Sequence, residues 1–156
     1  MKYLTLLLLI LIPTLSFAEG GVTVRPHIGI GTAESTPTTD SESAQHLGMR
    51  LLLNAGGTKK YGLELTQFEV DGGERFNAIG IVIEQKKWGW FNMSIGTVGY
   101  FSHSKNTNPI GLMTNLGWEP DNKHSLKPFI TYRADLIFAE HNQTIHSISS
   151  GLTFSF

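Results

Sequence analysis

The sequence predicts an all-β fold, an eight-stranded antiparallel barrel that runs up and down around one axis. Three observations predict it. No helical period is present after residue 19. Apolar and polar residues alternate instead with a period of two, the pattern of a strand with two different faces. Eight such segments follow one another about every 17 residues, strand plus connection, which suits one meander closed on itself.

Composition allows one domain and excludes several classes of function. The chain has 156 residues, of which 40% are hydrophobic and 16% charged, below the usual share of about a quarter. It contains no cysteine, which excludes a disulfide framework, thiolate metal sites and a cysteine nucleophile. Its 12 Lys and Arg residues do not exceed its 13 Asp and Glu residues, so no nucleic-acid partner is expected. The pairs Lys59-Lys60 and Lys86-Lys87 are interpreted as solvated turns.

The first residues have the pattern of a secretory signal peptide. A short positive start at 1–3 precedes an apolar run at 4–13, and Ser16-Phe17-Ala18 supplies a cleavage site before Glu19. The apolar run is shorter than the roughly 20 residues of a membrane-spanning helix. The expected organisation is a signal peptide at 1–18 and a barrel at 19–156.

The last predicted strand shows the alternation most clearly. In residues 146–156 the even positions are mostly apolar, and the odd positions are Ser147, Ser149, Gly151, Thr153 and Ser155. Upstream segments repeat the pattern at 22–31, 47–54, 61–66, 79–84, 91–96, 110–118 and 130–138. After Gly96 the phase becomes unclear, as at a β-bulge.

The polar face of these segments carries charged residues, and the period of two does not say which face is inside. The residues concerned are Arg25, His27, Arg50, Glu64, Glu84, Arg133 and Asp135. In a soluble lipocalin-like barrel they would face water, whereas in a membrane barrel they fill the lumen and the apolar set faces lipid. A polar face rich in Gly and Ser suits the narrow interior of an eight-stranded barrel, which favours the membrane alternative.

The two ends of the predicted barrel differ, which also favours a transmembrane barrel with a polar, filled interior. The connections at 56–60, 85–87 and 120–126 are rich in Lys, whereas those at 35–45, 71–76, 102–109 and 140–144 are mostly acidic or neutral. A periplasmic N-terminus would place the basic turns in the periplasm. Two aromatic girdles are expected where lipid meets water. The turn side holds Trp88, Trp90, Trp118, Tyr61 and Phe156, and the loop side holds Phe68, Phe76, Tyr100, Phe101 and Phe138.

At this point the chain resembles the small outer-membrane β-barrels of Gram-negative bacteria, the group that includes OmpA-type membrane domains. The resemblance rests on the signal peptide, the eight alternating strands and the final segment Gly151–Phe156. It implies export through the periplasm to the outer membrane, contact with lipid or lipopolysaccharide, and a monomer. It also implies that Phe156, with Phe154, is the signal read by the barrel-assembly machinery.

The charged residues of the polar face are expected to form a packed network inside the barrel rather than an ion path. Charges in a low-dielectric interior must pair, and an eight-stranded barrel is only wide enough for side chains to fill it. The turn between the second and third strands centres near Gly57-Thr58, which places Arg50 opposite Glu64. An Arg50–Glu64 ion pair is therefore predicted in the lumen.

Two other groups of residues are candidate sites. A metal could bind at the outer rim, where His46, His103, His141 and His146 fall near Glu34, Glu69 and Glu140. None of their spacings is a metal signature, so no metal or cofactor is predicted.

A lipid A deacylase of this shape would carry a His-x-Ser pair. Here His103-Ser104 and His146-Ser147 are adjacent, and adjacent residues point to opposite faces of a strand. The positions two after each His are Lys105 and Ile148. No catalytic residue is predicted. The expected function is a structural or surface-interaction component without a conducting pore, and a lipid A-modifying hydrolase is the alternative.

Overall fold

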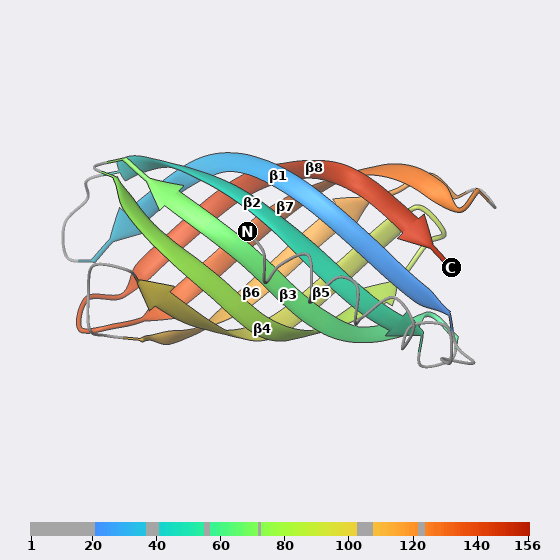
Figure 1. Cartoon of the computed structure of the whole chain (residues 1–156), viewed down its shortest axis with the longest axis horizontal. Coiled ribbons are helices and arrows are strands. Elements are labelled where there is room, and N and C mark those ends of the chain that lie inside the picture. The colour runs from blue at the N-terminus through green and yellow to red at the C-terminus, as the bar shows by residue number, and fades with distance from the viewer. Residues whose placement is uncertain (1–20, 37–40, 55–56, 72, 103–107, 122–123) are drawn as a thin grey trace, which may run out of the picture.

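The protein forms a closed barrel of eight antiparallel strands (Figure 1). The computed structural model describes residues 21–36, 41–54, 57–71, 73–102, 108–121 and 124–156, so the predicted signal peptide lies outside the described residues. The strands are β1 (Val22–Ser35), β2 (Ser41–Asn54), β3 (Lys59–Val70), β4 (Glu74–Lys86), β5 (Phe91–Ser102), β6 (Ile110–Trp118), β7 (Leu126–Phe138) and β8 (Gln143–Ser155). In that part of the chain no helix is long and apolar enough to cross a membrane.

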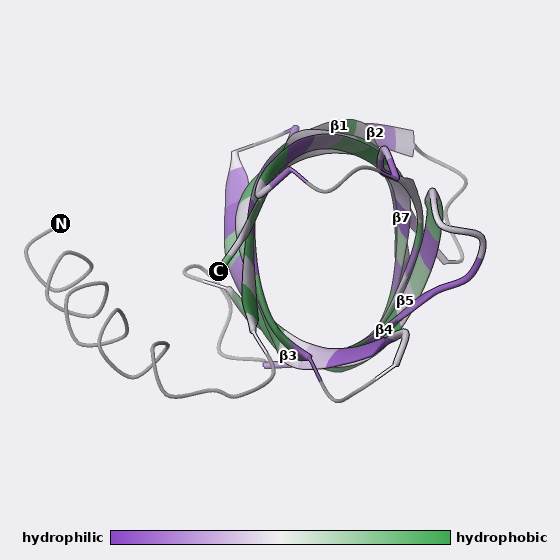
Figure 2. Ribbon diagram, turned by 90° about the vertical axis from the view of Figure 1, so that its right-hand side faces the viewer, coloured by the Kyte–Doolittle hydropathy of each residue, from purple (hydrophilic) through white to green (hydrophobic). Residues whose placement is uncertain are grey.

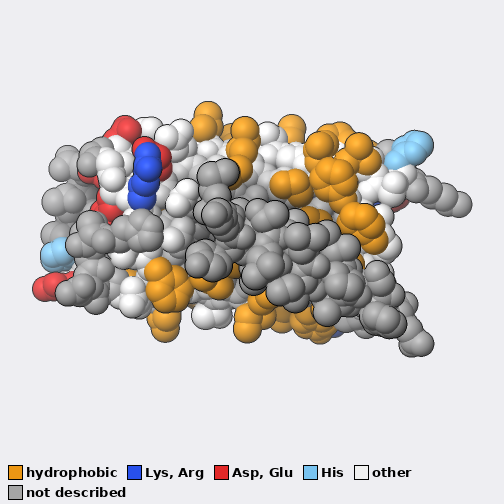
Figure 3. Space-filling model, viewed as in Figure 1, with side chains coloured by type: hydrophobic (Ala, Val, Ile, Leu, Met, Phe, Trp, Pro, Cys, Tyr) orange, Lys and Arg blue, Asp and Glu red, His pale blue; other side chains and the backbone are white. Residues whose placement is uncertain are grey.

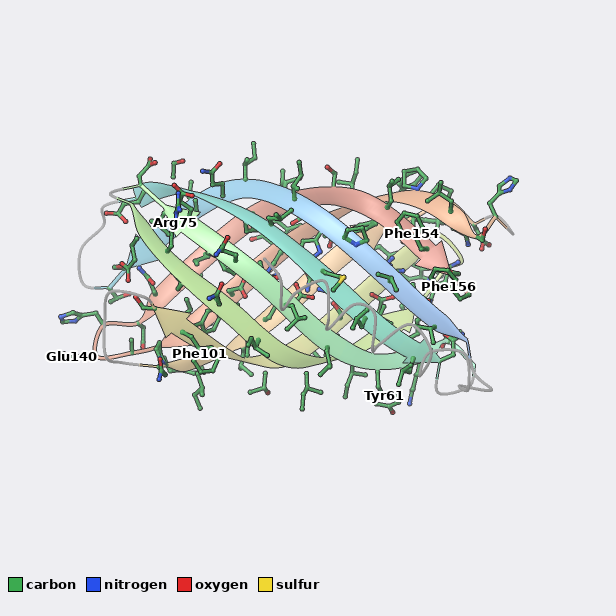
Figure 4. All side chains as sticks on the ribbon, in the orientation of Figure 1. Tyr61, Arg75, Phe101, Glu140, Phe154 and Phe156 are labelled. Atoms are coloured by element: carbon green, nitrogen blue, oxygen red, sulfur yellow. The ribbon has the colours of Figure 1, made fainter. Side chains whose placement is uncertain are left out.

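Each strand pairs with its neighbours in sequence, and β1 also pairs with β8 to close the barrel. We call the end that carries the β2–β3, β4–β5 and β6–β7 connections the turn end; Phe156 lies there too (Figures 1 and 4). The opposite end is the loop end. The predicted topology is confirmed.

Several strands extend further toward the loop end than the apolar alternation predicts. β2 begins at Ser41 rather than Leu47, and β3 ends at Val70 rather than Thr66. The additional outward positions are polar, as in the cross-strand pair Glu69 and Arg75. Backbone pairing continues there without an apolar face, so the hydrophobic pattern alone underestimates strand length.

The bulge predicted after Gly96 is absent. β5 keeps an unbroken register with β4 from Lys86↔Asn92 to Phe76↔Ser102, and with β6 as far as Gly99↔Ile110. The alternation is hard to follow in the sequence because apolar Val98 and Tyr100 follow small polar residues on the same inward face.

The outward face of the strands is mostly apolar, and the inward face carries the buried charged and polar residues together with some apolar side chains. Ile30 is 74% exposed and Ile81 67%, whereas Glu64 is 0% and Arg133 1% exposed. Figure 2 shows the alternation around the ring, and Figure 3 shows hydrophobic side chains over the middle of the wall. A barrel in water would place these faces the other way round, so the fold is that of a transmembrane barrel.

The aromatic girdle at the turn end is present, and the one at the loop end is only partly so. All five residues predicted for the turn end are exposed, and Trp88, Trp90 and Phe91 are in ring contact there. At the loop end Phe101 and Phe138 are exposed. The prediction was wrong for Phe68, Phe76 and Tyr100, which lie inside the barrel because their strand positions share the parity of the lumen residues.

Candidate functional site

A chain of ion pairs runs through the barrel interior, beginning below the loop end. Both oxygens of Asp135 accept hydrogen bonds from Arg133, at 2.7 and 2.9 Å. Arg133 also donates to Glu64 Oε1 at 2.7 Å, and Arg50 Nε donates to Glu64 Oε2 at 2.7 Å. Glu64 thus lies between two guanidinium groups and is fully buried.

The same chain continues to the turn end. Arg50 Nη1 lies 3.5 Å from Glu84 Oε2, and Arg25 donates to that same oxygen. Arg25 Nη2 donates to Glu119 Oε2 at 2.7 Å. Lys127 Nζ lies 4.0 Å from Glu119 Oε1. Positive and negative groups therefore alternate from one end of the lumen to the other.

Residues from all around the barrel build this network. The carboxylates Glu64, Glu84, Glu119 and Asp135 face the cations Arg25, Arg50, Arg133 and Lys127, with hydroxyl groups from Ser94, Tyr100 and Thr153 between them. Burying an unpaired charge costs several kcal/mol. Mutual pairing offsets that cost, because each charged group contacts one of opposite sign.

The predicted Arg50–Glu64 pair is present in this geometry. The β2–β3 register places the two residues directly opposite each other, and both face inward. The structure brings together the other predicted lumen residues as well. His27 Nε2 lies 3.3 Å from Glu64 Oε1, and its Nδ1 lies 3.2 Å from the carbonyl oxygen of Arg25.

Glu119, Tyr100 and Lys127 belong to the network but were not predicted from the sequence. Glu119 follows β6 directly and continues its inward parity, although the apolar alternation ends at Trp118 and Pro120 suggests a turn. Tyr100 donates from its hydroxyl to Asp135 Oδ1 at 2.7 Å. Continuing the alternation of faces one residue beyond β6 places Glu119 inside, and continuing it past Gly96 in β5 places Tyr100 inside.

Aromatic rings separate the network from the loop end. Phe68 stacks on Phe76 at a centroid distance of 5.1 Å, and Phe76 meets the edge of Tyr100 at 6.0 Å. The guanidinium of Arg133 lies 4.9 Å from the ring centroid of Phe68. We call these three rings the apolar seal, which Ile137 and Ile145 extend.

Little space remains in the polar part of the lumen. A cavity beside Arg25, Arg50 and Arg133 has a volume of about 10 Å³. That is about the smallest volume that can hold one water molecule. The interior is therefore filled by side chains.

His46 lies in the lumen and not at the solvated rim where the sequence suggested it. Its Nε2 is 2.9 Å from Ser149 Oγ, and its ring contacts those of His27 and Phe68. Its Nδ1 has no hydrogen-bond partner among the described residues. The inward parity of His46 on β2 explains this position.

The other candidate metal ligands are dispersed. His141, Glu34 and Glu140 are exposed at the loop end, Glu69 pairs with Arg75, and His146 faces outward. His103 lies outside the described residues. Among the residues that the structure describes, no group of three or more His, Asp or Glu side chains could hold a metal ion.

The adjacent His–Ser pairs do not form a hydrolase site within the described residues. His146 faces outward, where the Tyr132 hydroxyl lies 2.6 Å from its Nδ1, whereas Ser147 is buried on the inward face. His103, Ser104 and Lys105 lie outside the described residues.

The basic pairs at the turn end are engaged locally. Lys60 donates to Thr23 and Lys86 pairs with Asp121, while Lys59 and Lys87 are exposed.

An outward apolar belt around a filled, charge-paired lumen defines the class of small eight-stranded transmembrane barrels. Three solved structures share the fold. Neisserial surface protein A (NspA) has a TM-score of 0.60 and 11% identity, covering 88% of this chain and 100% of that one. Outer membrane protein AlkL in DMPC lipid bilayers has a TM-score of 0.53 and 7% identity, covering 90% and 92%. A de novo designed transmembrane β-barrel has a TM-score of 0.50 and 12% identity, covering 88% of this chain and 96% of that one.

These identities establish the fold alone. No protein-family model and no curated protein matches the chain.

Proposed function

We propose that the protein is an integral outer-membrane barrel that conducts no ions and acts as a structural component with an interaction surface at its loop end. The observation that carries this proposal is the filled lumen inside an outward apolar belt. Alternating ion pairs run from Asp135 to Glu119, and the apolar seal lies between them and the loop end. An ion would have to break these pairs and then displace packed aromatic rings.

The distribution of residues supports a periplasmic turn end. Tyr61 and Phe156 lie there and Phe101 lies toward the loop end (Figure 4). The exposed Lys59 and Lys87 are also at the turn end. In this proposal the signal peptide directs export, the barrel-assembly machinery inserts the chain, and the monomer contacts lipopolysaccharide around its belt.

The structure gives less support to the hydrolase alternative. The His46–Ser149 hydrogen bond has the chemistry of a base beside a nucleophile. Both residues are buried in the lumen, however, and no group orients His46 through Nδ1 among the described residues.

Electrical recording in planar lipid bilayers tests the absence of a pore. Purified, heat-modifiable protein should insert without producing discrete conductance steps, because ion pairs and packed aromatic rings occupy the lumen. A porin inserted in the same membranes is the positive control. Reproducible steps of uniform size from the wild-type protein would refute the non-conducting proposal.

Cysteine labelling on intact cells tests the orientation. The chain has no native cysteine, so Glu140→Cys and Lys59→Cys each create a single thiol at an exposed position, one at each end. A membrane-impermeant maleimide should label residue 140 in intact cells and residue 59 only after the outer membrane is permeabilised. The opposite pattern would reverse the orientation.

A further inference from the structure

A pocket opens at the loop end, directly above the apolar seal. Its volume is about 910 Å³, within the range of small-molecule sites. Phe76, Tyr100 and Ile137 line its base, and Glu74 and Glu140 belong to its rim. We call this pocket the vestibule. Its base is the seal, which lies between the vestibule and the charged network.

The charge around the vestibule is strongly negative. Among the described residues at the loop end, the carboxylates are Glu34, Glu42, Glu69, Asp71, Glu74 and Glu140, and Arg75 is the one Lys or Arg. Arg75 is bound by Glu69 through two hydrogen bonds of 3.1 Å, so that pair contributes little net field. Figure 4 places Glu140 at the extreme of this end. Such a field concentrates cations and repels anions.

We propose that the vestibule binds a small organic cation that carries an apolar group. The apolar group would lie against Phe76, Tyr100 and Ile137, where burial of its surface is favourable. The cationic group would lie toward the acidic rim, and aromatic faces add to the attraction for a quaternary ammonium. This inference rests on the proposed function in one respect, the orientation of the barrel, which decides from which side of the membrane the ligand arrives.

Other ligand classes fit this vestibule less well. An anion of the same size would meet the negative field without a free Lys or Arg among the described residues of this end, because Arg75 is already paired. A small cation without an apolar group would bury no apolar surface against the residues at the base of the vestibule. A bound metal ion is disfavoured, since the described residues contain no ligand cluster for one.

Binding is tested on the full barrel in nanodiscs of zwitterionic lipid, by calorimetry and saturation-transfer NMR. The probes are benzyltrimethylammonium, tetramethylammonium and benzenesulfonate, which are water-soluble and separate the apolar from the charged contribution. Empty nanodiscs give the background. Benzyltrimethylammonium should bind several-fold more tightly than either other probe, and more weakly as salt is raised. Equal binding of the cation and the anion would refute the proposal.

Matched variants locate the site. Glu140→Gln should weaken benzyltrimethylammonium binding about two- to fivefold, the effect of losing one exposed charge. Asp121→Asn removes an equivalent carboxylate at the turn end and should leave binding unchanged. Equal effects of the two variants, or no effect of Glu140→Gln, would overturn the vestibule site. Suppose that the protein gives no conductance steps in bilayers and is labelled at residue 140 in intact cells, but binds no cation. That result would refute this inference and leave the proposed function standing.

Discussion

Glu64→Gln is expected to lower the free energy of unfolding of the barrel by about 3–5 kcal/mol, the loss typical of breaking a buried ion pair. The Glu64 carboxylate accepts hydrogen bonds from Arg50, Arg133 and Thr66 and is fully buried. Glutamine keeps the size of the side chain but removes the charge that two guanidinium groups share. Urea unfolding in phosphatidylcholine vesicles measures the loss.

Glu69→Gln is the matched control. It makes the same chemical change on the same strand but on the outward face, in an exposed ion pair with Arg75. Exposed pairs contribute about 0–1 kcal/mol. If the two variants lost similar stability, the buried network would not be the source of the effect.

The Arg50–Glu64 contact itself is isolated by a double-mutant cycle. Arg50→Leu and Glu64→Leu together should cost less than the two single losses added, with a coupling of about 0.5–3 kcal/mol. Arg133 remains next to Asp135 in the double variant, so that contact is kept. Additive losses would mean that the two side chains do not meet.

Phe156→Asp is expected to lower the amount of folded protein in the outer membrane several-fold. The backbone of Phe156 exchanges two hydrogen bonds with Val22, at 2.9 and 3.2 Å, across the β1–β8 seam, and its ring is exposed at the turn end. In the proposed function this aromatic residue is the signal that the barrel-assembly machinery reads. Quantitative immunoblotting of heat-modifiable protein in membrane fractions measures the effect.

Phe138→Asp separates that signal from general loss of the apolar belt. Phe138 is an exposed phenylalanine on the outer face near the opposite end. Aspartate there removes a similar belt contact but leaves the last strand intact, so membrane levels should fall much less. Equal losses from the two variants would assign the effect to the belt, and unchanged levels of Phe156→Asp would argue against the membrane assignment.

Much of the architecture could be predicted because a strand alternates its faces with a period of two. That period placed Arg25, Arg50, Glu64, Glu84, Arg133 and Asp135 on one face, the small Gly and Ser residues of that face favoured the interior, and all six are buried. Neighbouring strands joined by a short turn also have a predictable register. The contact of Arg50 with Glu64 follows from the centre of one hairpin.

The inward aromatic residues were a different case. Phe68, Phe76 and Tyr100 obey the same parity, but their apolar character suggested the lipid face. The lumen accepts them because its loop end is closed by an apolar seal and not by charges. Residue type was therefore a poorer guide than parity at that end.

By itself, the sequence determined the strand number, the up-and-down order, the face of most residues and the pairing of Arg50 with Glu64 within one hairpin. Only the tertiary structure decided which side chains meet across the lumen. Arg25 contacts Glu84 and Glu119, although β1 pairs with neither β4 nor β6. Such contacts depend on the level of each residue along the barrel axis. That level is set by strand tilt and by the stagger at which β1 meets β8, which are properties of the closed barrel and of no single strand or hairpin.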